Sequence, residues 1–170
     1  MRAYGVYAAA TLALAPATHV TVSARYSHAR VGNTLTTEDG PKPHEALTYK
    51  RLNPSLGLAH ARGPQTWFAN IAQSNRVPTV IELGCADPEQ PCRLSVGLQS
   101  DPYLKQVISR TIEAGVRGGQ GGSGFSATLD RTVNRDDILF GRAGASRAGY
   151  FSNAIRAWTS VRAGCGAGRR

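Results

Sequence analysis

The residues of this sequence that could do chemistry do not gather into a catalytic set. Gly119–Gly124 has the G-x-G-x-x-G spacing of a dinucleotide-binding turn, but that chemistry needs a helix after the glycines. From Phe125 onward the residues alternate as in a strand, so we interpret the glycines as a hairpin. Serines, histidines and aspartates are present, but no G-x-S-x-G elbow connects them. The sequence therefore predicts no enzyme.

The residues that could bind a metal or a cofactor also lack the required spacing. Asp136 and Asp137 are adjacent, and neighbouring strand residues point to opposite faces, so these carboxylates do not converge on one ligand. The histidines are scattered, and none lies beside a cysteine at zinc-ligand spacing. They are His19, His28, His44 and His60. We expect no metal site and no cofactor.

The cysteines carry a prediction of their own. Cys85 and Cys92 close a short loop and suit a disulfide, which implies an oxidising compartment. Two free thiols are the alternative. Cys165 has no obvious partner and is left over.

Length and charge limit the classes of function. The 170 residues carry a net charge of +9, which raises the question of a nucleic-acid partner. Part of the excess lies in an acid-free C-terminal stretch with Arg156, Arg162, Arg169 and Arg170, and the rest is spread singly. We therefore expect no nucleic-acid partner. The sequence has no apolar run of about 18 residues, so no transmembrane helix is expected, although transmembrane strands remain compatible with it.

Period-2 alternation is the main structural signal. In 108–117, apolar side chains fall on one face and polar ones on the other, as in a strand between an apolar medium and water. The segment 19–27 repeats the pattern with Val20, Val22, Ala24 and Tyr26. Further strands are expected over 47–60, around Trp67, Ala69 and Ile71, over 125–134, and from 149 to about 155.

The N-terminus allows two interpretations. Residues 1–17 have an early Arg, an apolar run and an Ala-Pro-Ala sequence, which are features of a signal peptide. Tyr4 and Tyr7 interrupt the apolar run, and the turn at 15–18 leads directly into another strand. We favour a first strand over a signal peptide.

The connections alternate in length: short at 15–18, 61–65 and 118–124, longer at 31–46, 74–104 and 141–148. The sequence therefore predicts an all-β fold, an antiparallel up-and-down meander that is a fragment of a large transmembrane β-barrel. The expected lumen-facing charges are Arg25, Arg51, Glu113, Arg117 and Asp130. Arg110 and Arg131 fall on the apolar side, either near the membrane boundary or because a bulge shifts the register.

Two ordered motifs carry a family resemblance. The first matches S-x-x-x-R-x-P-T-x-x-E-L with Ser74, Arg76, Pro78, Thr79, Glu82 and Leu83. The second matches D/N-P-x-L-K/E…T-x-E-x-G-x-R with Asp101, Pro102, Leu104, Lys105, Thr111, Glu113, Gly115 and Arg117. With these motifs the chain resembles the barrel of a TonB-dependent outer-membrane receptor.

The resemblance implies uptake of a scarce nutrient, such as a ferric siderophore, across a bacterial outer membrane. The implied partners are outer-membrane lipid and, in a full-length relative, the TonB complex and an iron-siderophore-type ligand. We expect residues 1–154 to form a partial barrel of about seven strands without a plug domain, which does not transport alone. Residues 155–170 are expected to be a basic tail, disordered or out of frame, without the aromatic C-terminal residue that closes such barrels. The 73–105 connection is expected to lie outside the cell and contribute to ligand capture.

The alternative is a secreted soluble β-domain that binds carbohydrate or protein, with the N-terminus as its signal. Such a domain would place its strands around a closed core.

Overall fold

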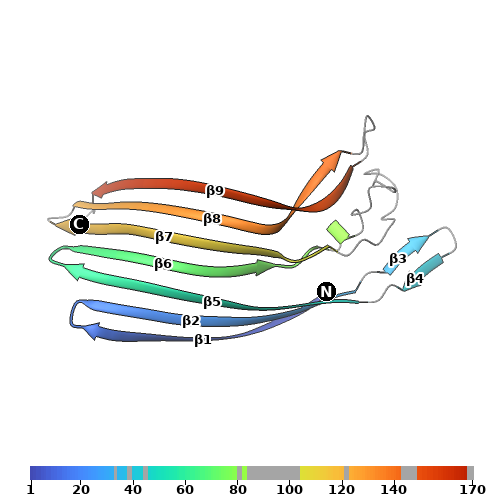
Figure 1. Cartoon of the computed structure of the whole chain (residues 1–170), viewed down its shortest axis with the longest axis horizontal. Coiled ribbons are helices and arrows are strands. Elements are labelled where there is room, and N and C mark those ends of the chain that lie inside the picture. Colours follow the sequence, from blue (N-terminus) through green and yellow to red (C-terminus); the bar gives the residue numbers. More distant parts are fainter. Residues whose placement is uncertain are drawn as a thin grey trace.

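The structure, a computed structural model, describes residues 1–32, 34–37, 40–43, 46–79, 82–83, 104–120, 123–142 and 149–167. One antiparallel sheet of seven strands contains most of them, in the order β1-β2-β5-β6-β7-β8-β9 (Figure 1). A separate two-stranded sheet pairs β3 with β4. Consecutive long strands are neighbours throughout, which confirms the predicted meander.

The strand bounds follow the predicted alternation. The seven-stranded sheet consists of β1 (Arg2–Ala15), β2 (Thr18–Val31), β5 (Leu47–Arg62), β6 (Gln65–Arg76), β7 (Val107–Gln120), β8 (Ser123–Arg142) and β9 (Gly149–Ala167). The small sheet consists of β3 (Thr34–Thr37) and β4 (Gly40–Pro43). The first segment is a strand, as favoured above. No helix among the described residues is long and apolar enough to cross a membrane.

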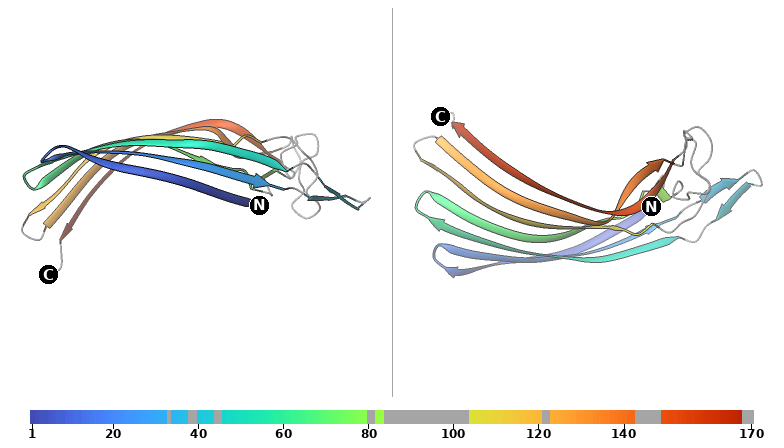
Figure 2. Two further views of the ribbon diagram at one scale, coloured as in Figure 1. Left: turned by 90° about the horizontal axis from the view of Figure 1, so that it is seen from below. Right: turned by 45° about the horizontal axis from the view of Figure 1, so that its top comes forward.

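The short and long connections lie at opposite ends of the sheet (Figure 1). We call the end with the turns at 16–17 and 63–64 the turn end, and the opposite end the loop end. Gly63 has a φ of 57°, which a residue with a side chain rarely adopts, so glycine allows the tight turn there. The sheet as a whole is bent (Figure 2).

One face of the sheet is apolar and exposed. Val22 is 48% exposed, Tyr26 41% and Ile112 60%, so these strands do not enclose a common core. Each large apolar side chain left in water forgoes about 1.5–3 kcal/mol. Summed over the face, this exceeds the roughly 5–15 kcal/mol that stabilises an ordinary domain. The face therefore requires an apolar medium. It also includes Val6, Leu12, Leu52, Leu56, Leu58, Trp67, Ile71, Phe125, Leu129 and Val161.

The opposite face is polar, and its side chains bond across the strands. Thr11 faces Thr21 with the hydroxyl oxygens 3.0 Å apart, Ser23 faces Ser55 at 2.7 Å, and Thr111 faces Thr132 at 2.9 Å. Such cross-strand pairs stabilise a sheet on the face they share. We call the two surfaces the apolar face and the polar face.

The connection 31–46, predicted only as a long connection, contains the β3–β4 hairpin, whose strands are too short to show a period. One expectation about the elements is wrong. The last strand was expected to lose its pattern after Ile155, with a disordered tail over 155–170. Instead β9 continues to Ala167 and pairs with β8 along that length. The related hypothesis of a frame change after Ala154 stays a prediction.

β9 continues because its polar side keeps finding partners on β8. Ser160 lies opposite Asp130 and Arg162 opposite Thr128, and both Ser160 and Arg162 hydrogen-bond to the Asp130 carboxylate. On the other side, Val161 stands between the small residues Thr159 and Ala163, and the large aromatic residue Trp158 lies on the polar side, opposite Thr132. This mixture of sizes conceals the period that a uniform row of large apolar residues would display.

Pro54 marks the place where one ladder stops. The β5–β6 register runs from Arg62 to Ser55 and ends there, because Pro54 has no N–H to continue it. Just beyond, the Gln73 side-chain amide donates to the carbonyl of Leu52 at 3.0 Å. A side chain thus supplies a donor that the ladder no longer provides.

Candidate functional site

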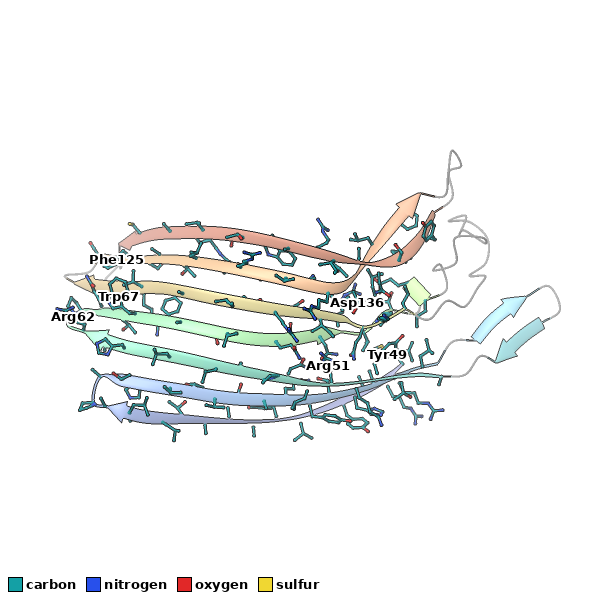
Figure 3. The ribbon with its side chains drawn as sticks, in the orientation of Figure 1. Tyr49, Arg51, Arg62, Trp67, Phe125 and Asp136 are labelled. Atoms are coloured by element: carbon teal, nitrogen blue, oxygen red, sulfur yellow. The ribbon has the colours of Figure 1, made fainter. Side chains whose placement is uncertain are left out.

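The buried apolar cluster of the described residues lies at the loop end. It joins β2, β5, β7 and β8 to the two segments that leave and re-enter the sheet around the connection after β6. Its members are Val31, Tyr49, Leu83, Leu104, Val107 and Ile138, with Leu47, Val77 and Phe151 packed against them. Tyr49 and Asp136 lie at this end, whereas Trp67 and Phe125 lie near the turn end (Figure 3). We call this cluster the collar. It fixes both ends of the long connection to the wall.

A charged turn begins directly after β6. Both carboxylate oxygens of Glu82 accept from Arg76, at 3.0 and 2.9 Å. The Glu82 carboxylate also accepts from the Thr79 backbone N–H at 2.7 Å and hydroxyl at 3.1 Å. The Glu82 N–H in turn donates to the Thr79 hydroxyl at 3.2 Å. This reciprocal pattern is a capping box, closed by an arginine.

The first motif is therefore a structural turn. Pro78 is fully buried and Leu83 is 2% exposed, so the apolar residues of the motif enter the wall while its charged residues bond one another. Ser74 lies in β6, paired with Ser109 of β7. The motif orients the chain as it leaves the sheet.

The environment of Glu82 sets its charge. Burial acts to raise the pKa of the Glu82 carboxyl, but hydrogen bonds from Arg76 and Thr79 and the charge of Arg76 outweigh it. The net effect lowers the pKa below its ordinary value. Glu82 is therefore anionic at neutral pH and holds the turn as a charge-assisted network.

The segment that re-enters the sheet before β7 is also held in place by hydrogen bonds. The Tyr49 hydroxyl donates to the Leu104 carbonyl at 2.9 Å. The Asn153 side chain accepts from the Lys105 N–H at 2.9 Å and donates to the Lys105 carbonyl at 3.2 Å. Asn153 also donates to the Asp136 carbonyl at 2.8 Å, where the β8–β9 register shifts and Asp136 has a φ of 55°. The side chain thus stabilises a bulge and the incoming segment together.

Of the described residues of the second motif, Leu104 and Lys105 precede β7, and Leu104 belongs to the collar; the others lie along β7. By the register, Thr111, Glu113 and Arg117 lie on the polar face, opposite Thr132, Asp130 and Ser126. Asp101 and Pro102, and also Cys85 and Cys92, lie outside the described residues. Cys165 is a free thiol and is exposed.

The neighbouring Phe68 ring explains why position 115 is a glycine. A Cβ at this position would lie 2.6 Å from the Phe68 ring and 2.6 Å from the Ala127 carbonyl oxygen. Both distances are too short for a side chain, so glycine lets Phe68 lie across β7.

Asp130 and Glu113 lie directly opposite each other, a pairing of like charges that destabilises a sheet by itself. Arg162 compensates for it, with a guanidinium nitrogen 2.6 Å from an Asp130 carboxylate oxygen. Asp130 and Glu113 were predicted as polar-face charges, whereas Arg162 was assigned to the tail and missed. Ser160 and Arg162 are two positions apart and therefore share one face of a strand, and this spacing was the signal available in the sequence.

Among the described residues no three His, Cys, Asp or Glu side chains come close enough to hold a metal ion. What the residues build is a wall with one apolar face, one polar face and a firmly held loop end.

Comparison with known proteins agrees with this architecture. The sequence matches the family described as TonB dependent receptor-like, beta-barrel, over residues 1–166. No curated protein matches it in a direct sequence search.

Among solved structures, the copper transporter OprC aligns over 96% of this chain with a TM-score of 0.75 and 17% identity. The siderophore receptor PirA from Pseudomonas aeruginosa aligns over 95% with a TM-score of 0.66 and 18% identity. The FrpB iron transporter from Neisseria meningitidis aligns over 99% with a TM-score of 0.65 and 17% identity. At these identities the likeness concerns the fold.

The chain spans 26% of the length of OprC, 30% of PirA and 24% of FrpB. Members of the matched family are transport receptors and not enzymes, in agreement with the prediction from the sequence. The family match over nearly the whole chain, together with the seven-stranded meander, leads to one conclusion: this chain belongs to the TonB-dependent receptor family, as part of its β-barrel.

Proposed function

We propose that the chain is part of the wall of a bacterial outer-membrane receptor that imports a scarce nutrient, such as a ferric siderophore, with energy from the TonB complex. The observation that carries the proposal is the division of the sheet into an exposed apolar face and a hydrogen-bonded polar face. That division suits a wall between lipid and a wet lumen. The neighbours' descriptions as copper, iron and siderophore proteins support the substrate class.

In this proposal the apolar face contacts outer-membrane lipid and the polar face lines the lumen. The turn end lies in the periplasm and the loop end lies outside the cell, as in barrels with short periplasmic turns and longer outer loops. Trp67 and Phe125, near the turn end, then belong to the inner aromatic girdle.

The sheet does not transport by itself. It ends in two edge strands, β1 and β9, which pair with other strands on one side only. In hydrocarbon an unpaired edge leaves N–H and C=O groups without partners, at a cost of several kcal/mol each. A working receptor therefore needs further strands beside β1 and β9.

Ligand capture falls to the 73–105 connection. The collar and the Glu82 turn hold the two described ends of this connection to the wall. A hollow on the polar face near the loop end offers further contacts. Its lining includes Ser23, Arg25, Ser27, Asn53 and Asn75.

Cys85 and Cys92 are proposed to form a disulfide within this connection. Mass spectrometry of the purified chain, alkylated with and without reductant, tests the pairing. Modification of all three cysteines without reductant would exclude the disulfide, whereas modification of Cys165 alone is the expected result.

A chimera tests the function. The aligned strands of OprC are replaced by residues 1–167 of this chain, and the hybrid is expressed in cells lacking their own copy of the receptor. We expect the hybrid to be found in the outer membrane and to show the heat-dependent gel mobility of a folded barrel. The reason is that the sheet supplies the same strand order and the rest of the barrel pairs with its edges. The chain alone should give no uptake.

Two controls complete the experiment. A hybrid carrying Leu56→Asp and Ile112→Asp on the apolar face should fail to assemble, since charges on the lipid face are costly. A hybrid carrying Ser55→Asp and Thr111→Asp on the polar face should assemble. If the apolar-face hybrid and the polar-face hybrid were both soluble in the periplasm, the result would contradict the proposal and favour a soluble β-domain.

A further inference from the structure

Three arginines stand on the apolar face. Arg110 of β7 lies opposite Val133 of β8, and Val133 has Arg131 and Arg135 two residues away on either side. Arg131 pairs with Ile112 and Arg135 with Ile108, so all three arginines share the face of those isoleucines. Diagonal neighbours of this kind lie about 7–8 Å apart. We call these residues the arginine cluster.

The position of the cluster is not produced by a bulge. The β7–β8 register is continuous from Ile108 to Gln120, and the register shift of β8 comes later, against β9 after Asn134. Of the two explanations open at the level of the sequence, this excludes the bulge for Arg110 and Arg131. All three side chains are exposed.

Within the part of the chain that the structure describes, the cluster has no anionic partner, since none of the three arginines forms an ion pair there. The Nε of Arg110 donates to Gln73 Oε1 at 3.1 Å, and Gln73 is itself anchored to the Leu52 carbonyl. This bond orients the guanidinium and leaves its terminal N–H groups available for another acceptor.

The position of the cluster across the membrane follows from its distance to the hairpin turns. Arg131, Gln73 and Tyr26 each lie about ten residues from the turn of their own hairpin, which at a rise of about 3.3 Å and a tilt of about 40° corresponds to roughly 25 Å. The apolar band of such a barrel is about 25 Å tall. Arg110 and Arg135 lie further toward the loop end. The cluster therefore lies at the outer border of the hydrocarbon.

Below and beside the arginines the face is hollowed. A shallow groove crosses β2, β5, β6, β7 and β8, and the whole cluster contributes to its lining. The remaining lining is largely apolar and includes Val22, Pro54, Leu56, Ile71, Ile112 and Val133. A groove of apolar side chains ending at three cations matches a molecule with hydrocarbon chains and an anionic head.

We propose that the arginine cluster and this groove form a binding site for a phosphorylated glycolipid of the outer leaflet, with its phosphates on the guanidinium groups and an acyl chain in the groove. A phosphate monoester carries about −1.5 to −2 charges at neutral pH, so a headgroup with two phosphates neutralises three arginines better than a singly charged phosphodiester. The guanidinium fork suits phosphate geometry. The inference rests on the proposed membrane location of the apolar face.

The test uses the OprC hybrid that carries residues 1–167 of this chain in a closed barrel, reconstituted into phosphatidylcholine nanodiscs that contain bisphosphorylated lipid A, phosphatidylglycerol or neither. Native mass spectrometry gives the number and affinity of bound lipids. We expect preferential retention of bisphosphorylated lipid A. The triple variant Arg110→Gln, Arg131→Gln, Arg135→Gln should bind it roughly a hundredfold more weakly, since each basic residue near an anionic surface contributes roughly a factor of five.

The matched control is Arg25→Gln, Arg51→Gln, Arg117→Gln, which removes three charges from the polar face and should leave lipid binding unchanged. Equal binding by the wild-type chain and the cluster variant would overturn the inference. So would equal retention of phosphatidylglycerol, or displacement of lipid A by millimolar inorganic phosphate, which indicates a site for free phosphate. Failure of the hybrid with the unmodified chain to insert into lipid contradicts the proposed function itself, and protease protection in plain phosphatidylcholine detects that failure separately.

Discussion

At the level of single residues, the turn after β6 depends on Glu82, whose carboxylate collects bonds from Arg76 and from both donors of Thr79. Removing its charge leaves the Arg76 guanidinium without its carboxylate. We expect Glu82→Gln to lower the free energy of unfolding at pH 7 by about 1–2 kcal/mol. Urea unfolding of the OprC hybrid in detergent measures the difference. Glu113→Gln also removes a carboxylate, but one that lies opposite Asp130, so this control should not lower the free energy of unfolding.

The pH dependence has a definite sign. Because the pKa of Glu82 is lower in the folded chain than in the unfolded one, its contribution is complete above the ordinary carboxyl pKa and disappears as the pH falls through the folded value. The stability difference between wild type and Glu82→Gln should therefore be constant from neutral pH to about pH 5 and shrink below about pH 4. A difference that grows on acidification would contradict the assignment.

Gly115 provides a steric prediction. Gly115→Ala places a methyl group against both the Phe68 ring and the Ala127 carbonyl, and overpacking of this kind costs about 1–3 kcal/mol. Gly57→Ala is the matched control, because its nearest neighbouring atom is 3.8 Å away. Equal unfolding midpoints for the two variants would show that the Phe68 ring does not require a glycine at position 115.

At the level of elements, β9 is held to β8 by its polar face. Arg162→Gln leaves the Asp130 carboxylate, only 5% exposed, opposite Glu113 without its cation. We expect a lower unfolding midpoint and faster hydrogen exchange along 157–163, with recovery when Asp130→Asn is added. Arg156→Gln, which removes another β9 arginine without a described partner, should leave exchange along 157–163 unchanged.

The elements also show what the sequence could reveal. Strands with large apolar residues on one face, such as β2 and β7, were predicted because the two faces differ in chemistry. The predicted β9 ended too early because small residues stand on its apolar side and Trp158 stands on its polar side, and β3 and β4 are too short to show a period. The partners of Asn153 are not visible in the sequence, because Lys105 lies 48 positions away and meets it only through the fold. Glu82 was singled out as part of a family motif, and its role in a capped turn came from the structure.

At the level of the whole molecule, the chain is a bent wall whose two faces require different media, with firm attachment points for one long connection. This explains why a sequence of ordinary hydropathy exposes so many large apolar side chains. It also explains why cationic residues on the apolar face gather near the loop end, where they reach polar headgroups.

The most direct test of the two-faced wall is a nitroxide scan of β7 in lipid. Single cysteines at successive positions from 108 to 117, in the OprC hybrid with its other cysteines replaced, are labelled and measured for collision with oxygen and with a water-soluble nickel chelate. We expect oxygen accessibility to peak at even positions and nickel accessibility at odd positions, with a period of two. Nickel accessibility at every position, or protection of every position from both reagents, would contradict the account.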